Sequence, residues 1–216
     1  MSIHKTYAVL GLGKYGRAVA EELVKSGAEV LAVDIDEVNV NDASTTIPLC
    51  KCADITDPEV ISRLGIAEMD VVVVAMARNL EASVMAITLC KEVGVKTVIA
   101  KCANEMQRKI MTRVGADKVI FPEKESGIRL AKNLLSSGFS DLIELSEEVS
   151  MVEMEVKPGW VGKTLLQLDL RKKYSINVVA IRKDDKVITE VDPQLPLEQS
   201  MTLIVIANLQ QIKKIK

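Results

Sequence analysis

The chain has 216 residues, of which 48% are hydrophobic and 27% charged, and its formal net charge is −2. This composition is typical of a globular protein, and the small negative charge argues against a dedicated nucleic-acid-binding protein, which usually carries a basic surplus. The longest apolar run, residues 71–77, is far shorter than the roughly 18 residues that a membrane-spanning helix needs. Residues 1–11 lead directly into a strand and a glycine loop without the pattern of a signal peptide. We therefore expect a cytosolic protein.

Up to about residue 138, short apolar runs alternate with segments whose apolar residues recur at helical spacing. Glycines at positions 27, 94 and 115 are placed to end three of the helices. Such alternation is typical of a parallel sheet with crossover helices on both faces. The sequence therefore predicts an α/β, Rossmann-like domain over residues 1–138. Its six parallel strands are expected at residues 7–10, 29–33, just before 52, 71–75, 97–100 and 118–121.

The pattern changes after a helix that is expected to run from residue 122 to about residue 137. The segment "VSMVEMEV" alternates like a strand, and two strand-like runs flank the charged turn at residues 183–186. Two short amphipathic pieces lie within residues 163–175, and "MTLIVIA" is a final strand. These features predict a small α+β domain over residues 139–216.

The loop "GLGKYG" at residues 11–16 has the Gly-x-Gly-x-x-Gly spacing of a nucleotide-binding turn between a strand and a helix. Gly11 permits the tight turn, Gly13 lets the backbone approach a phosphate, and Gly16 lets the helix pack closely on the strand. Asp34 ends the second strand and follows Gly16 by 18 residues, close to the spacing of a ribose-binding acid. We expect Asp34 to accept hydrogen bonds from both ribose hydroxyls and to disfavour the 2′-phosphate of NADP.

Two further segments are expected near the nucleotide. The stretch "CADITD" follows the third strand, so backbone groups of Ala53, Asp54 and Ile55 can read the adenine edge, while Thr56 or Asp57 caps the next helix. Lys101 ends the fifth strand, at the carboxyl edge where open α/β sheets bind ligands. The alternative interpretations are a structural role for Asp54 and a solvated strand end for Lys101.

The sequence offers few groups for catalysis. Its one histidine, His4, precedes the first strand, so no Ser/His or Cys/His pair can be assembled elsewhere. The four cysteines, at positions 50, 52, 90 and 102, lack the spacing of a zinc or redox motif, and we expect them to be small core residues. We therefore predict that the chain is not an enzyme. A small NAD-dependent oxidoreductase that uses a tyrosine or lysine as its acid or base remains the alternative.

Nearly the whole chain resembles the regulator-of-potassium-conductance family, in particular the cytosolic regulatory subunits of Ktr/Trk potassium uptake systems. The resemblance rests on "AVLGLGKYGRAVAEEL", "EVLAVDIDE", "CADITDPEVISRLGI", "DVVVVAMARNLEAS", "RVGADKVIFPEKE" and "LLQLDLRKKYSINVVAI". It implies dimers that assemble into an octameric ring, docked on the inner face of the membrane beneath an integral potassium channel. It also implies that the glycine loop holds ATP or ADP as a signal, with NAD or NADH as the alternative in the same cleft.

The motifs and the resemblance together predict the nucleotide site. It comprises Gly11, Leu12, Gly13, Lys14, Tyr15, Gly16, Asp34, Ile35, Asp36, Ala53, Asp54, Ile55, Lys101 and Glu123. The resemblance implies that Glu123 approaches the nucleotide across a dimer interface and helps to hold Mg²⁺ or Ca²⁺. The alternative is that Glu123 only stabilises the start of its helix. Lys14 stands where the family often has arginine, and the resemblance implies that it reaches the γ-phosphate.

The resemblance also implies a cyclic di-AMP site in the C-terminal domain. Its residues would be Leu165, Leu166, Asp169, Leu170, Arg171, Ile176, Asn177 and Pro193. A two-fold symmetric dinucleotide suits the interface of a two-fold symmetric dimer, because one surface patch is used twice. The alternative is a dimer core in which Arg171 and Asp169 form a structural ion pair.

Overall fold

A computed structural model describes residues 5–135, 139–146, 148–184, 186–208 and 211. The chain divides into two compact units, Met1–Lys124 and Glu125–Lys216, which are described separately below. The predicted domain boundary at residue 138 lies beyond the end of helix α6 (Pro122–Leu135), whereas the two units divide near the start of that helix.

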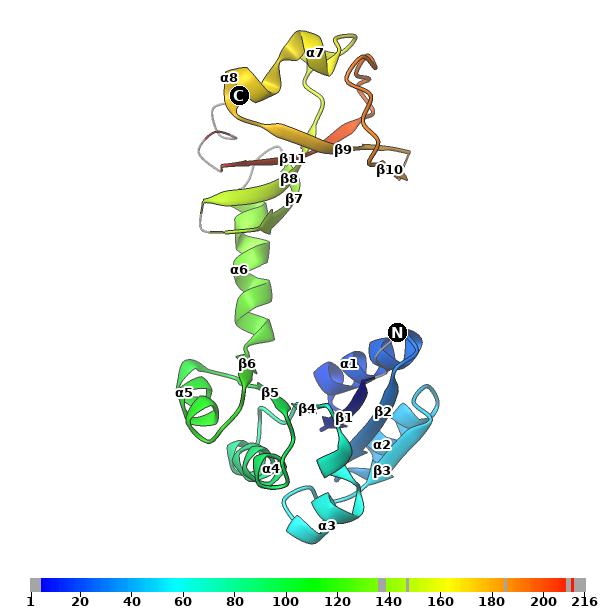
Figure 1. Ribbon diagram of the computed structural model, residues 1–216, viewed down its shortest axis with the longest axis vertical. Helices are drawn as coiled ribbons and strands as arrows, with labels where there is room; N and C mark the ends of the chain where they lie inside the picture. The colour runs from blue at the N-terminus through cyan, green and yellow to red at the C-terminus, as the bar shows by residue number, and fades with distance from the viewer. Residues whose placement is uncertain (1–4, 136–138, 147, 185, 209–210, 212–216) are drawn as a thin grey trace. The chain divides into compact units, whose positions relative to one another are not determined.

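The first unit contains a six-stranded parallel sheet, which confirms the predicted fold class (Figure 1). Its strands are β1 (Thr6–Leu10), β2 (Glu29–Asp34), β3 (Leu49–Cys52), β4 (Val71–Val74), β5 (Thr97–Lys101) and β6 (Lys118–Ile120), in the order β3-β2-β1-β4-β5-β6. Its helices are α1 (Lys14–Lys25), α2 (Glu37–Ser44), α3 (Pro58–Arg63), α4 (Leu80–Glu92) and α5 (Glu105–Arg113). The order reverses between β1 and β4, at the point where open α/β sheets bind ligands.

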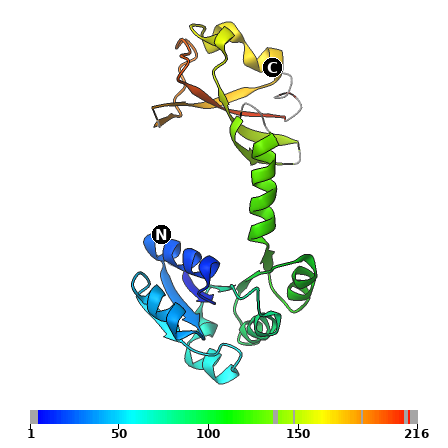
Figure 2. The same cartoon turned by 180° about the vertical axis from the view of Figure 1, so that it is seen from behind.

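Both faces of this sheet are buried, because successive strand residues point to opposite sides. On β1, Ala8 and Leu10 belong to one core cluster together with Ile87 of α4 and Met111 of α5. Val9 belongs to a second cluster, which contains residues of α1 and α2. Helices therefore cover the two faces, as Figure 2 also shows from behind.

The expected helix ends are also confirmed. Gly27, Gly94 and Gly115 have φ angles of 83°, 90° and 112°, the left-handed conformation that stops a helix. Asp57 caps α3, because its side chain accepts a hydrogen bond from the amide of Glu59 at 2.8 Å.

The second unit contains a five-stranded antiparallel sheet in the order β10-β9-β11-β8-β7. The strands are β7 (Phe139–Glu144), β8 (Val149–Glu155), β9 (Asn177–Lys183), β10 (Lys186–Ile188) and β11 (Thr202–Asn208). The short helices α7 (Leu165–Leu168) and α8 (Leu170–Tyr174) pack against the sheet through a core that includes Leu168, Leu170 and Leu203. The sequence predicted all of these elements except β7.

The cysteines differ in their surroundings. Cys90 and Cys102 are buried, and burial raises the pKa of the Cys90 thiol to about 12. Cys50 is half-buried and Cys52 is exposed, so the expectation of four core cysteines is wrong for Cys52. The reason is that Cys52 ends β3, an edge strand of the sheet. None of the helices in the described ranges is long and apolar enough to cross a bilayer.

The glycine loop allows a direct test of the packing. A Cβ atom on Gly16 would lie 1.9 Å from the carbonyl oxygen of Gly11 and 3.0 Å from Cβ of Ala75. We expect Gly16→Ala to lower the free energy of unfolding of this unit by about 1–3 kcal/mol, the usual cost of overpacking. Gly13 is the matched control, because its φ is −62° and no atom lies within 4 Å of an added Cβ.

The measurement is urea denaturation of both variants, followed by far-UV circular dichroism. Gly13→Ala should change the stability by less than about 0.5 kcal/mol. Equal stability of the Gly16→Ala variant and the native chain would contradict this account of the loop.

Candidate functional site

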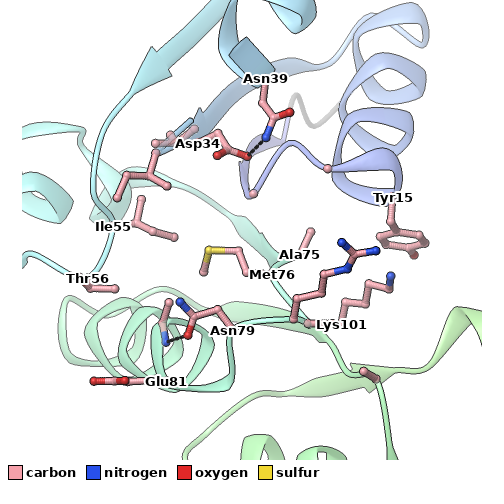
Figure 3. Close-up of a pocket in the computed structure, with 18 of the residues that line it drawn as sticks. Tyr15, Asp34, Asn39, Ile55, Thr56, Ala75, Met76, Asn79, Glu81 and Lys101 are labelled. Atoms are coloured by element: carbon pink, nitrogen blue, oxygen red, sulfur yellow. Dashed lines mark hydrogen bonds between the residues drawn. The ribbon is translucent and has the colours of Figure 1, made fainter. Parts of the chain in front are cut away.

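A pocket of about 900 Å³ opens at the carboxyl ends of the parallel strands in the first unit. Its walls are the glycine loop after β1, the end of β2, the turn after β3, the loop between β4 and α4, and the end of β5. Figure 3 shows Asp34 and Asn39 together on one side and Tyr15 and Lys101 together at another end, with Met76 between them. The pocket thus separates an acidic end from a cationic end.

The carboxylate of Asp34 forms the acidic end of the pocket and is fixed by hydrogen bonds from neighbouring residues. One oxygen accepts hydrogen bonds from the amide of Leu12 at 2.6 Å and from the side-chain amide of Asn39 at 3.3 Å. The other oxygen accepts from the amide of Asp36 at 2.9 Å. A carboxylate offers about four lone-pair sites, so three are used and one remains. Asp34 can therefore accept one ribose hydroxyl directly, and a second only if the Asn39 amide moves.

Lys101 dominates the cationic end. Its side chain is only 15% exposed, and its Nζ lies 2.6 Å from Oε1 of Glu123 and 5.3 Å from the centroid of the Tyr15 ring. The ammonium group lowers the pKa of the Glu123 carboxyl. The Lys101 ammonium group is therefore held between a carboxylate and an aromatic face.

Two other cations line the pocket. Lys14 is the first residue of α1, and Arg78 lies in the loop between β4 and α4; both are exposed. Within the described part of the chain, neither forms an ion pair, whereas Lys101 is neutralised by Glu123. The charges available to a bound phosphate are therefore those of Lys14 and Arg78, beside the amides at the start of α1.

The turn after β3 forms another wall through Ile55 and Thr56. Asp54 also lines the pocket, but its carboxylate accepts hydrogen bonds from the amide of Thr56 at 2.9 Å and from its hydroxyl at 2.7 Å. These bonds lower the pKa of Asp54. Asp54 thus stabilises its own turn, which presents Ile55 and Thr56 to the pocket.

The structure brings most of the predicted nucleotide-site residues together. Ten line the pocket: Gly11, Gly13, Lys14, Tyr15, Asp34, Ile35, Asp54, Ile55, Lys101 and Glu123. The other four, Leu12, Gly16, Asp36 and Ala53, do not line it. Leu12 and Gly16 are buried in the packing of the loop, Asp36 caps α2, and the amide of Ala53 binds the carbonyl oxygen of Asp34.

Sequence reasoning missed the loop between β4 and α4. This loop contributes Ala75, Met76, Ala77, Arg78 and Asn79, and Asn39 of α2 was missed as well. A signal existed, because β4 was predicted as a central parallel strand and the loop after such a strand lies at the ligand-binding edge. The segment was used only for the family resemblance and no ligand contact was assigned to it, so the topology was the signal that could have placed it at the site.

A single chain offers few ligands for a metal ion. Glu123 is exposed and its carboxylate is paired with Lys101. Among the residues that the structure describes, no group of three or more His, Cys, Asp or Glu side chains is placed to hold a metal ion. The site nevertheless suits Mg²⁺ in one respect, since this ion often takes only one or two carboxylates together with the phosphates of its ligand.

The predicted cyclic di-AMP residues separate into a buried and an exposed set. Leu170 and Ile176 lie in the core of the second unit, and Leu165 packs against that core. Leu166, Arg171, Asn177 and Pro193 are exposed, and the amide of Leu166 donates a hydrogen bond to the carbonyl oxygen of Pro193 at 3.2 Å. Asp169 adopts φ = 47° between α7 and α8, and in the described part of the chain it forms no ion pair with Arg171.

Comparisons with known proteins agree with this architecture. The TrkA-N domain matches residues 7–122 and the TrkA-C domain matches residues 151–216. Ktr system potassium uptake protein C of Bacillus subtilis (strain 168) is 38% identical over 210 residues, covering 97% of this chain and 95% of that protein. Ktr system potassium uptake protein A of Vibrio alginolyticus is 34% identical over 202 residues, covering 94% and 92%.

A solved structure of the GsuK channel bound to NAD has the same fold, with a TM-score of 0.55 and 20% identity. The match covers 97% of this chain and 37% of that chain, so the present chain spans well under half of the solved protein.

Proposed function

The chain belongs to the regulator-of-potassium-conductance family, in its Ktr/Trk potassium-uptake branch, and we propose that it is a gating subunit that senses adenine nucleotides. The pocket of the first unit carries this proposal. It combines a ribose-binding acid at one end with helix amides and cations at the other, which matches the chemistry of a nucleotide. Asp34, Asp54, Lys101 and Glu123 along its walls are engaged in structural contacts, so binding without turnover is the function that these groups support.

We propose ATP and ADP as the ligands. The ribose lies against Asp34, the base against Ile55 and Thr56, and the phosphates against the start of α1. The γ-phosphate distinguishes the two nucleotides through Lys14 and Arg78, which form no ion pair among the residues that the structure describes. NAD has the same adenosine portion as ATP and ADP, and the GsuK channel, which has the same fold, binds NAD. However, NAD carries a second nucleoside in place of a terminal phosphate, so it would place no terminal phosphate near these cations.

The ribose acid gives the first test of this proposal. Asp34→Ala should weaken ATP binding by about tenfold or more, because each charge-assisted hydrogen bond contributes about 1.5–3 kcal/mol. Isothermal titration calorimetry measures the effect. Asp42→Ala is the matched control, since Asp42 is an exposed acid of α2 that does not line the pocket. Unchanged ATP affinity in the Asp34→Ala variant would refute the assignment.

Glu123 tests the proposed role of a divalent cation. We propose that Glu123 helps to hold Mg²⁺ or Ca²⁺ beside the γ-phosphate, with a second protomer closing the site. Without a divalent cation, Glu123→Gln should bind ATP at least as tightly as the native chain, because glutamine does not neutralise Lys101. With Mg²⁺, the native chain should gain affinity and the variant should not.

The same calorimetric titrations, with and without Mg²⁺, measure this difference. Glu105→Gln is the matched control, because Glu105 also pairs with a lysine, Lys124 at 2.5 Å, but does not line the pocket. If Mg²⁺ raises the ATP affinity of the native chain and of Glu123→Gln equally, the proposal that Glu123 helps to hold the cation is refuted.

The proposed partner is an integral membrane potassium channel, with this chain at the inner face of the cell membrane. We further propose that dimers assemble into an octameric ring. Helix α6 supports an assembly, because it exposes Ile128, Leu130 and Leu134 to 45%, 59% and 76%. Large apolar side chains exposed on one helix are typical of a surface that another chain covers.

The second unit carries a further proposed ligand, cyclic di-AMP. We propose that its phosphates bind Arg171 of two protomers, with Leu166 and Pro193 against the bases and Asn177 beside a base edge. The buried residues Leu170 and Ile176 then support this surface from within.

Calorimetric titration of the full chain with cyclic di-AMP tests this site. Arg171→Ala should weaken binding by at least about tenfold, since it removes a charged hydrogen-bond donor to phosphate. Lys172→Ala is the control, because Lys172 is the adjacent exposed cation. If cyclic di-AMP does not bind the native chain, the ligand site is refuted, and the surface around Arg171 is a dimer contact only.

A further inference from the structure

The second unit contains a cavity of about 530 Å³ that shares only Leu170 with the proposed cyclic di-AMP residues and none with the nucleotide pocket of the first unit. It lies between the segment that begins at Lys157 and helix α8. Its walls include Trp160, Tyr174 and three lysines, Lys157, Lys163 and Lys173. The volume falls within the range of about 300–1,000 Å³ that is usual for small-molecule sites.

The charges of this cavity are of one sign. Three of its nine lining residues are lysines, and none is an aspartate or glutamate. Lys163 and Lys173 are exposed and have no ion pair within the described part of the chain. By contrast, two other cations of the same unit are paired with carboxylates: Arg182 with Glu153, and Lys183 with Glu198. A bound anion would therefore supply a counter-charge to Lys163 and Lys173.

Two aromatic rings contribute to the apolar part of the cavity. Trp160 and Tyr174 are half-buried and pack against the core of this unit, so their positions are fixed. Lys157 Nζ lies 5.8 Å from the centroid of the Trp160 ring, and burial lowers the pKa of Lys157.

The framework around these side chains is well ordered by hydrogen bonds. Gly162, with φ = 78°, donates its amide to the carbonyl oxygen of Leu197 at 2.8 Å, and Leu197 donates back to Lys163 at 2.9 Å. On α8, Leu170, Lys173 and Tyr174 share one face at helical spacing, and all three line the cavity. Lys172, on the same helix, does not line it.

We propose that this cavity binds a small ligand in which a planar ring is joined to a phosphate group, of the size of a nucleoside monophosphate. Lys163 and Lys173 bind the phosphate, while Trp160 and Tyr174 contact the ring. The site is independent of the proposed ATP/ADP pocket, which lies in the other unit, and of Arg171, which does not line the cavity.

The only tryptophan of the chain makes a direct experiment possible, because Trp160 lines the cavity. Titration of the full chain with AMP should give a saturable change in tryptophan fluorescence. Adenosine, which lacks the phosphate, and inorganic phosphate, which lacks the ring, should each bind at least about tenfold more weakly than AMP. Asp34→Ala, which disables the proposed site in the first unit, should leave the change intact.

Substitution of the two exposed lysines then tests the assignment. Lys163→Gln and Lys173→Gln remove the charge and keep a polar side chain that is one atom shorter, and each should weaken AMP binding by about tenfold. Lys172→Gln should bind AMP like the native chain. The proposal is overturned by the lack of a saturable change with AMP, by loss of the change in Asp34→Ala, or by native affinity in both lysine variants.

Discussion

The carboxylate of Asp34 is the group on which the architecture of the nucleotide pocket depends. Its hydrogen bonds join the end of β2 to the glycine loop through Leu12 and to α2 through Asp36 and Asn39. The carbonyl oxygen of the same residue binds the amide of Ala53, which begins the turn after β3. One residue thus fixes three of the segments that surround the ligand space. The remaining lone-pair site of Asp34 limits how a ribose can approach, so Asn39 helps to determine the pose of the ligand.

The charges at the other end of the pocket connect ligand binding to the rest of the chain. Lys101 ends β5, and its partner Glu123 is the second residue of α6. In the proposed mechanism, a phosphate competes with Glu123 for Lys101, or a phosphate-bound cation competes with Lys101 for Glu123. Helix α6 continues into the second unit, so a change at Glu123 acts on the element that links the two units. ATP and ADP can shift a conformational equilibrium only if they interact differently with its states, and the γ-phosphate supplies such a difference.

The sequence predicted most of this arrangement because its local signals agree. The glycine loop, the acid at the end of β2 and the alternation of strands and helices each indicate the same fold, and ten of the fourteen predicted nucleotide-site residues line the pocket. The other four have structural roles: Leu12 and Gly16 are buried in the loop's own packing, Asp36 caps α2, and the amide of Ala53 donates a hydrogen bond to the carbonyl oxygen of Asp34. Of these roles, the spacing of the glycine motif indicated only that of Gly16.

Other features could not be predicted because they arise from tertiary structure. Arg78 and Asn39 reach the pocket only because β4 ends and α2 begins beside it. Strand β7 follows a segment rich in serine and glycine, whose composition indicates a loop. The cavity of the second unit, which Lys157, Lys163 and Lys173 line, is formed by residues on a turn and on α8. These segments come together only in the folded domain.

Potassium flux into liposomes, reconstituted with this chain and a Ktr-type membrane subunit, tests the central claim most directly. The account predicts that ATP and ADP give clearly different flux with the native chain, and that Asp34→Ala abolishes this difference. Equal flux in ATP and ADP with the native chain, under conditions where calorimetry shows that both nucleotides are bound, would contradict it.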